Sequence, residues 1–148
     1  MAKEIERKFL VCGDFEPYVK HRFDIAQGYL STDPDRTVRI RIRDNQGFIT
    51  VKTRNNGCVR NEWEFEIPVD DARDMLAACP VCLVKTRCIA DAGNGLYWEI
   101  DVFGGKNQGL IVAEIELPAP DTTFARPEWL GEEVTGDPKY YNSNLSKA

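Results

Sequence analysis

Charged side chains occupy every second position along much of this chain. Residues 4–10, for example, place Glu4, Glu6 and Lys8 in alternation with mostly apolar neighbours. Because a β-strand points successive side chains to opposite faces, this pattern predicts a strand with one charged face. The pattern recurs at Arg39, Arg41 and Arg43, at Glu62, Glu64 and Glu66, at Lys85 and Arg87, at Glu99 and Asp101, and at Glu114 and Glu116.

Turn residues divide the chain into eight predicted strands. They cover residues 3–11, 24–30, 38–44, 48–54, 59–68, 82–90, 96–103 and 110–117. Glycine-containing hairpin turns are predicted at residues 45–47 and 55–57. Helical stretches are predicted at about 15–22, from Asp70 or Asp71 to about 78 with Pro80 ending the helix, and at about 127–130. No strand is predicted in the last thirty residues.

The dominance of strands with hairpin connections favours one antiparallel sheet, and about eight strands is a natural number for closure into a barrel. At 148 residues the chain is long enough for one domain with its own core. We therefore expect a single α+β domain over residues 1–148, built as an eight-stranded antiparallel β-barrel with a few peripheral helices.

The charged face has two interpretations. It could be the solvated outer face of an ordinary antiparallel sheet. However, its charges are sorted by sign, and like charges roughly 7 Å apart repel by about 2.4 kcal/mol at an effective dielectric of 20. Rows of single sign are better explained if an anion meets the cations and a divalent cation meets the carboxylates. Such a face would line a wet lumen filled by ligand, since burying unpaired charge costs several kcal/mol per ion.

The residue types indicate which ligands that lumen would hold. Arginine forks and lysine point charges converging on one cavity suit a polyanion with several phosphoryl groups. Carboxylates without histidine or cysteine partners suit a hard cation such as Mg²⁺ or Mn²⁺. Together these groups are typical of metal-assisted phosphoryl transfer. Neither a P-loop nor a Rossmann glycine motif occurs in the chain.

The segment Glu4-Ile5-Glu6-Arg7-Lys8 resembles the Glu-x-Glu-x-Lys signature of the CYTH, or triphosphate tunnel metalloenzyme, superfamily. Members of this superfamily form an eight-stranded antiparallel tunnel that binds and usually hydrolyses triphosphates. The resemblance continues through Arg39-Ile40-Arg41, residues 84–87, residues 98–103 and residues 113–117, in the same order. It covers nearly the whole chain and is similar to the compact bacterial members.

The resemblance implies roles for particular side chains. Glu4, Glu6, Glu114 and Glu116 would ligate the metal, and Lys8, Arg39, Arg41, Lys52, Lys85 and Arg87 would bind the phosphates. Lys8 and Tyr29 would activate water, although Tyr29 could instead be an aromatic of the tunnel wall. Glu62, Glu64 and Asp101 would support the site, with Glu62 and Glu64 either contacting metal or orienting arginines.

The activity expected from these features is hydrolysis of inorganic triphosphate to pyrophosphate and phosphate. Rivals within the same fold are a class IV adenylate cyclase and a thiamine or nucleoside triphosphatase. An alternative function of a different class is that of a non-catalytic module that binds nucleotides or polyphosphate. The substrate would be a small polyanion in each case, and the oligomeric state is not predicted.

Composition limits the possible partners and cellular location of the protein. A net charge of −5 argues against generic nucleic-acid binding, and no apolar run is long enough to span a membrane. Residues 1–11 form a charged strand rather than a signal peptide. Five irregularly spaced cysteines suit a reducing, cytoplasmic compartment. Cys79 and Cys82 have redox-motif spacing but lack the βαβ context of that motif, and the single histidine, His21, is expected at the surface of a helical stretch.

Overall fold

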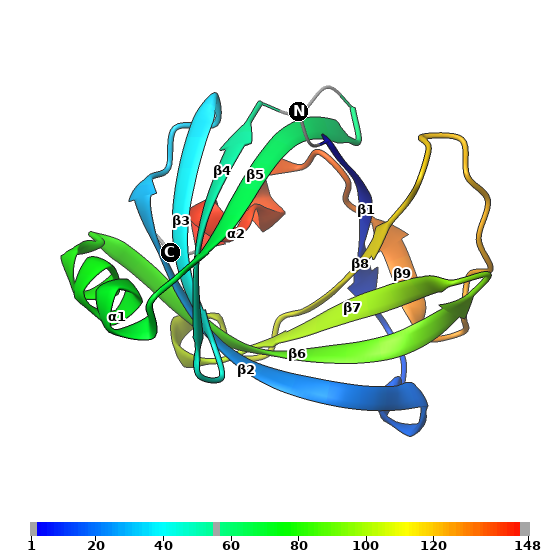
Figure 1. Ribbon diagram of the computed structural model, residues 1–148. Helices are drawn as coiled ribbons and strands as arrows, with labels where there is room; N and C mark the ends of the chain where they lie inside the picture. The colour runs from blue at the N-terminus through cyan, green and yellow to red at the C-terminus, as the bar shows by residue number, and fades with distance from the viewer. Residues whose placement is uncertain (1–2, 55–56, 146–148) are drawn as a thin grey trace.

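The fold is a closed antiparallel β-barrel with few helices, seen in a computed structural model that describes residues 3–54 and 57–145 (Figure 1). Its strands are β1 (Lys3–Val11), β2 (Val19–Ser31), β3 (Arg36–Arg43), β4 (Gln46–Thr53), β5 (Val59–Ile67), β6 (Val81–Gly93), β7 (Leu96–Phe103), β8 (Ile111–Glu116) and β9 (Leu130–Glu133). The helices are α1 (Val69–Ala78) and α2 (Asn142–Leu145), with short 3-10 turns η1 (Glu16–Tyr18), η2 (Gly105–Asn107) and η3 (Pro138–Tyr140).

Strand β1 closes the barrel. The sheet runs in the order β5-β4-β3-β2-β6-β7-β8-β1-β9, and β1 also pairs with β5 through Lys3 opposite Asn61 and Glu4 opposite Arg60. Eight strands therefore complete the ring, which confirms the predicted barrel. Strand β9 continues along the same side of β1 beyond the short β5 pairing, with Phe9 opposite Glu133.

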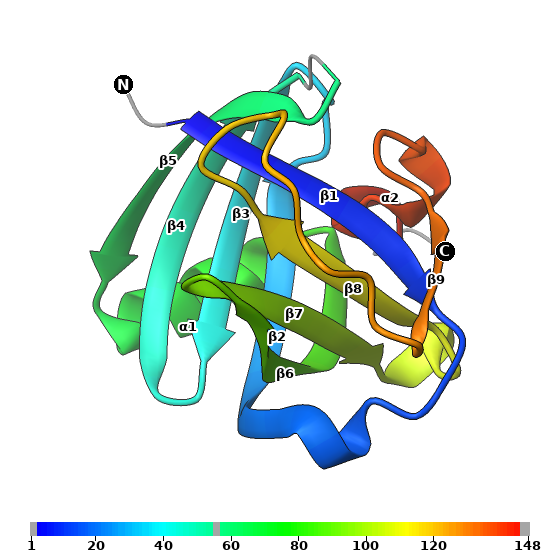
Figure 2. The same cartoon turned by 90° about the vertical axis from the view of Figure 1, so that its right-hand side faces the viewer.

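The apolar faces of the strands point outward and are covered by other parts of the chain. Helix α1 packs over β2, β3 and β4, where Ile40, Ala72 and Cys79 form a buried cluster. A larger cluster on β1, β6, β7 and β8 contains Phe9 and Trp98, whose rings meet edge to face. The connection from β8 to β9 runs over this second cluster (Figure 2). Hydrophobic burial therefore stabilises the outside of the barrel and leaves the inside to charged side chains.

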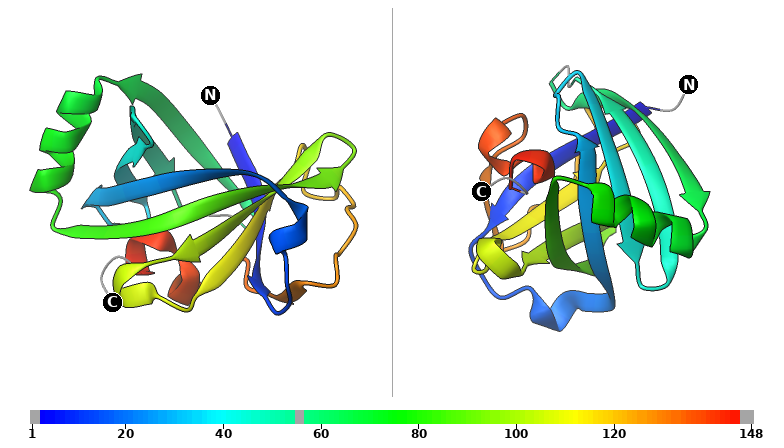
Figure 3. Two further views of the ribbon diagram at one scale, coloured as in Figure 1. Left: turned by 90° about the horizontal axis from the view of Figure 1, so that it is seen from below. Right: turned by 90° about the vertical axis from the view of Figure 1, so that its left-hand side faces the viewer.

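The inner face is apolar at one end. Leu10, Leu83, Phe103 and Val112 each lie two residues from a charged inner position, and they pack together with Leu145 of α2. The C-terminal segment therefore covers this end of the barrel (Figure 3). Neither α1 nor α2 is long and apolar enough to cross a membrane, and no other described helix is.

Several predicted elements differ from the structure. The helix predicted at 15–22 is wrong beyond Glu16–Tyr18, because β2 begins at Val19 and pairs with an equally extended β6. His21 is exposed, as expected, but lies on this strand. The helix predicted at 127–130 is also wrong, since only a turn closes there before β9 begins at Leu130. The hairpin turn predicted at 55–57 lies partly outside the described residues.

Candidate active site

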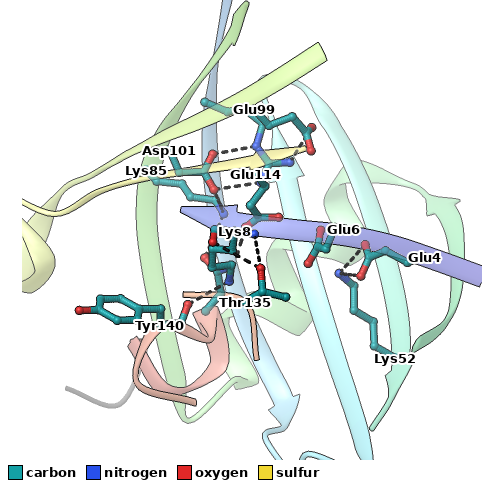
Figure 4. Close-up of polar contacts among 12 residues, drawn as sticks. Glu4, Glu6, Lys8, Lys52, Lys85, Glu99, Asp101, Glu114, Thr135 and Tyr140 are labelled. Atoms are coloured by element: carbon teal, nitrogen blue, oxygen red, sulfur yellow. Dashed lines mark hydrogen bonds and ion pairs between the residues drawn. The ribbon is translucent and has the colours of Figure 1, made fainter. Parts of the chain in front are cut away.

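A cavity of about 340 Å³ occupies the barrel interior and is lined by the charged face. The structure brings most of the predicted site residues to its wall. These are Glu4, Glu6, Lys8, Tyr29, Arg39, Arg41, Lys52, Glu62, Glu64, Arg87, Glu114 and Glu116. Lys85 and Asp101 do not line the cavity; their side chains are buried and contact one another (Figure 4).

Glu4 is held by two cations. The Lys52 Nζ donates to its two carboxylate oxygens at 3.1 and 3.0 Å, and the Arg60 Nε donates to Oε1 at 2.9 Å. Burial alone would raise the pKa of Glu4, but the attraction of Lys52 and Arg60 lowers it well below the ordinary range. Glu4 is therefore an ionised carboxylate whose charge is already balanced.

Other carboxylates crowd together without that balance. Glu6 on β1 lies opposite Glu116 on β8, and Glu114 lies opposite Glu99 on β7. Burial, with the nearby charges of Glu114 and Glu4, raises the pKa of Glu6 well above its usual range. Partial burial likewise raises the pKa of Glu116, with Glu4 and Glu99 adding repulsion. Like charges placed opposite one another in a sheet are destabilising, and Arg60, whose Nη2 lies 3.5 Å from Glu6 Oε1, offsets only part of this repulsion.

Glu114 differs from its neighbours because a lysine faces it. The Lys8 Nζ lies 3.6 Å from Glu114 Oε1. Burial would raise the pKa of Glu114, but Lys8 and a hydrogen bond with Glu6 lower it well below its usual value. Glu6 and Glu114 therefore titrate as a coupled pair, with the proton favoured on Glu6.

The donor chemistry of this cluster fits a hard divalent cation, since its ligating atoms are all carboxylate oxygens. Within residues 3–54 and 57–145, no three Asp, Glu, His or Cys side chains already converge as a coordination shell. Glu6, Glu114 and Glu116 would therefore have to move toward one another to share an ion. Glu4 would also have to give up part of its contact with Lys52 or Arg60.

Two neighbouring arginines are short of partners. Arg41 is buried and donates through Nε to Gln27 Oε1 at 2.9 Å, but it forms no ion pair with any described carboxylate. Burial, and then the charges of Arg39 and Arg87, lower the pKa of Arg41 to about 9. The buried Nε of Arg39 has no hydrogen-bond partner among the described residues. Both guanidinium groups are thus ready to meet an anion, since a buried cation or donor without a partner is costly.

Glu62 and Glu64 contact cations of the wall. Glu62 lies 3.6 Å from Lys52 Nζ, and burial with a hydrogen bond to Glu4 raises its pKa to about 7. Glu64 accepts from Thr50 Oγ1 at 2.8 Å and lies 3.4 Å from Arg39 Nη2. The structure therefore displays contact of Glu62 and Glu64 with cations of the wall, which is one of the two roles expected for them.

Tyr29 and Lys8 both line the cavity but have different partners. The Gln27 Nε2 donates to the Tyr29 hydroxyl at 3.0 Å, and Gln27 therefore bridges Arg41 and Tyr29. The Lys8 Nζ donates to the backbone carbonyl of Tyr140 at 3.0 Å. No hydrogen bond joins Lys8 to Tyr29 in the described structure. Their joint action on water therefore stays a prediction.

Lys85 was expected on the phosphate-binding wall, but its side chain is fully buried behind it. Its Nζ contacts Asp101 Oδ2 at 2.7 Å and Asn142 Oδ1 at 3.0 Å. Arg87 meets the same Asp101 through two nitrogens at 2.8 and 3.0 Å, and Glu99 at 3.1 Å. Asp101 thus supports the site as expected, because it fixes the Arg87 fork toward the cavity.

Sequence reasoning missed some residues of the wall. Arg60 could have been found, since it shares the inner face of β5 with Glu62 and Glu64 at a spacing of two. The C-terminal residues of the wall lie outside any strand and show no such periodicity. The remaining lining residues include Pro34, Thr37, Arg43, Arg54, Glu99, Pro138, Tyr141, Asn142, Ser143 and Asn144.

Comparison with known proteins yields consistent matches over nearly the whole chain. The sequence model of a family described as the CYTH domain matches residues 2–148. An inorganic triphosphatase of Acetivibrio thermocellus is 43% identical over 148 residues, covering 99% of this chain and 95% of that protein. One of Nitrosomonas europaea is 37% identical over 147 residues, covering 97% and 96%. A crystal structure of an inorganic triphosphatase superposes with a TM-score of 0.71 at 34% identity, covering 98% of each chain.

Proposed function

This chain belongs to the CYTH domain family, and from that membership we propose that it hydrolyses inorganic triphosphate to pyrophosphate and phosphate. Two relatives that match almost its full length are inorganic triphosphatases. The cavity volume of about 340 Å³ suits a small ligand rather than a large one. The chain is accordingly an enzyme that acts on a small polyanion.

The observation that carries the proposal is the buried arginine pair. Arg41 has no carboxylate partner among the described residues, and Arg39 leaves a buried N–H unsatisfied. A triphosphate supplies several anionic oxygens, each able to accept charge-assisted hydrogen bonds from such forks. Lys52 and Arg87 add positive charge to the same wall. Substrate would therefore replace the missing partners.

A divalent cation, Mg²⁺ or Mn²⁺, is part of the proposal. Glu6, Glu114 and Glu116 would hold it, with Glu4 beside them, because burial and neighbouring carboxylates raise the pKa of Glu6 and of Glu116, and a bound cation would offset that repulsion. When bound, such an ion neutralises charge on phosphate oxygens and favours ionisation of water. Occupancy would also relieve the repulsion between Glu6 and Glu114.

The remaining side chains would position the reactants. Arg39, Arg41, Lys52 and Arg87 bind and orient the phosphate chain, and Asp101 keeps Arg87 in place. Tyr29, oriented by Gln27, presents its hydroxyl at the cavity wall as a group that orders or deprotonates water. Lys8 would share this task once substrate draws its ammonium from the Tyr140 carbonyl.

The test is a product assay with tripolyphosphate, ATP and thiamine triphosphate, each with Mg²⁺, Mn²⁺ or excess chelator. We expect tripolyphosphate to be the best substrate, equal amounts of phosphate and pyrophosphate, and no turnover in chelator. Formation of cyclic AMP from ATP would support the cyclase alternative instead. Tight binding without turnover of any of the three would support a binding module.

We also propose a cytoplasmic location. All five cysteines are free thiols, of which Cys79 and Cys88 are buried. Free thiols persist in reducing compartments, whereas oxidising ones favour disulfides. Fractionation of source cells with an antibody to the protein would test this.

A further inference from the structure

Lys8 is held by the segment of chain that follows β9. The Val134 N–H donates to the Lys8 carbonyl at 2.8 Å. The Lys8 N–H donates to the Thr135 hydroxyl oxygen at 2.9 Å, and the Lys8 Nζ donates to the Tyr140 carbonyl at 3.0 Å (Figure 4). The backbone and the ammonium of one cavity-lining lysine therefore contact the same stretch of chain, residues 134–140.

The Thr135 hydroxyl accepts a backbone hydrogen bond where β9 has already ended. Lys8 pairs with β8 on one side. Backbone hydrogen bonds in an antiparallel pair join every second residue, and the Leu117 N–H donates to the Ile5 carbonyl, so the odd-numbered residues of β1 make the bonds to β8. The N–H of Lys8 therefore points away from β8, toward the side of β9. Because β9 ends two residues before Thr135, a side-chain oxygen takes the place of a strand carbonyl.

Glu133 and Arg7 fix the direction of the Thr135 hydroxyl. Thr135 donates through Oγ1 to Glu133 Oε2 at 2.7 Å, which is closer than the Lys8 carbonyl at 3.4 Å. The Arg7 Nε donates to the same Glu133 oxygen at 2.8 Å, and its Nη2 donates to Oε1 at 2.5 Å. These hydrogen bonds from Arg7 lower the pKa of Glu133, so Glu133 is an ionised acceptor. Since a hydroxyl has one proton, donation to Glu133 leaves a lone pair of Oγ1 for the Lys8 N–H.

We infer that Thr135 is a positioning residue, whose hydroxyl fixes the Lys8 backbone and thereby the place of the Lys8 ammonium during triphosphate hydrolysis. This inference rests on the proposed function and deepens it. The Lys8 Nζ contacts the Tyr140 carbonyl at 3.0 Å and lies 3.6 Å from Glu114 Oε1. A lysine stem is flexible, so these contacts depend on a fixed backbone. A displacement of about 1 Å in a reacting group can lower a rate by up to about 100-fold.

The experiment measures steady-state hydrolysis of tripolyphosphate with Mg²⁺ or Mn²⁺, per folded protein, the folded fraction being determined by circular dichroism at the assay temperature. Thr135→Val removes the hydroxyl at nearly constant volume, and Thr135→Ser keeps it. We expect Thr135→Val to lower kcat by about tenfold or more, with KM changed less than about twofold. Thr135→Ser should restore kcat to within about threefold of the wild type.

Thr122→Val is the matched control. The Thr122 hydroxyl oxygen also accepts from a backbone N–H, that of Ala119 at 3.2 Å, and neither residue lines the cavity. Thr122→Val should leave kcat and KM unchanged. A fall in kcat equal to that of Thr135→Val would overturn the inference, because loss of any such hydrogen bond would then have the same effect.

A double-mutant cycle with Lys8→Ala separates positioning of Lys8 from a general effect on the fold. Residual turnover in the Lys8→Ala background is measured with enzyme in excess over substrate. There, Thr135→Val should lower the rate by less than about twofold, because the side chain that Thr135 positions is gone. A tenfold loss in both backgrounds would overturn the inference. So would wild-type kcat in Thr135→Val, or failure of Thr135→Ser to restore kcat.

If Thr135→Val does not fold, Glu133→Gln carries the same cycle. It neutralises the acceptor of the hydroxyl proton, so kcat should fall by about threefold when Lys8 is present and stay unchanged when Lys8 is replaced. Equal falls in both backgrounds would contradict the inference. Normal hydrolysis by the wild type with unaffected variants would overturn the inference and leave the proposed function intact. A wild type that does not hydrolyse tripolyphosphate would overturn the proposed function itself.

Discussion

The Lys85 ammonium and the Asp101 carboxylate meet at 2.7 Å behind the cavity wall, where neither side chain is exposed beyond 2%. Arg87 reaches the same carboxylate from the cavity side. One buried anion therefore holds both a buried lysine and an arginine of the cavity wall. Lys85 also contacts Asn142 of α2, and it does not line the cavity.

Replacement of Asp101 should strongly destabilise the fold. Asp101→Asn leaves Lys85 and Arg87 as buried cations without a carboxylate, and losing one partner of a buried pair costs about 3–5 kcal/mol. Urea denaturation would measure the loss. Glu99→Gln, which removes a more exposed partner of Arg87, should cost less than about 1 kcal/mol. Equal effects of the two variants would contradict this assignment.

The same carboxylate should affect acid stability. Although burial opposes ionisation, Arg87 and Lys85 lower the pKa of Asp101 from 3.8 to about 2. A lowered folded-state pKa stabilises the protein above the ordinary carboxyl pKa, and this contribution is lost as the pH falls from about 4 toward 2. The unfolding free energy of the wild type should therefore fall by about 1.5–2 kcal/mol more than that of Asp101→Asn in this window. Parallel pH profiles would contradict the prediction.

Arg41 should oppose stability in the empty protein and support binding. Arg41→Met removes a buried cation that lies near Arg39 and Arg87 and has no described carboxylate partner. We expect its unfolding free energy without ligand to be unchanged or raised by about 1 kcal/mol, with triphosphate binding weakened at least tenfold. Thermal unfolding and calorimetry would measure the two effects. A destabilised variant with normal binding would show that Arg41 is structural.

Glu6 should link metal binding to stability. Its raised pKa means that its contribution to stability is present below the ordinary carboxyl pKa and is lost as the pH rises through the raised value. In chelator at pH 8, Glu6→Gln should therefore melt at a higher temperature than the wild type. Mg²⁺ or Mn²⁺ should raise the melting temperature of the wild type but not of the variant. Equal shifts in both proteins would place the ion elsewhere.

Tyr29 should affect turnover more than binding. Tyr29→Phe keeps the buried ring and removes the hydroxyl that Gln27 orients, so turnover of triphosphate should fall by about 10²-fold while its dissociation constant changes little. Tyr97→Phe, at an exposed position of β7, provides the control. Wild-type turnover in Tyr29→Phe would mean that the ring is only part of the wall.

Alternation along the strands was enough to predict which side chains point into the barrel. It could not predict depth, because the inner face includes both the exposed end of the tunnel and the region beneath α2. Lys85 shares the parity of Arg87, yet packing of Asn142 and Leu145 places it behind the wall. Whether a side chain of the inner face reaches the cavity depends on where the C-terminal segment packs. The local sequence around Lys85 does not indicate this.

Strand β9 was not predicted, because it too depends on a tertiary contact. Its four residues, Leu130–Glu133, show no alternation and are extended because β1 offers an unpaired edge. The glycine at position 131 fits this close pairing, since a Cβ atom there would lie 2.9 Å from the Leu10 carbonyl oxygen. The sequence alone does not indicate which backbone approaches so closely.

The pairing of β1 has a consequence for the order of folding. Its partners are residues 59–61, 112–116 and 130–133, so the ladder of β1 can form only after these later segments are available. Contacts between such distant segments close large loops and form slowly. Since β1 carries Glu4, Glu6 and Lys8, the wall of the charged cavity is complete only when β1 has paired with β5 and β8. A nascent or C-terminally truncated polypeptide would have the arginine row but no active site.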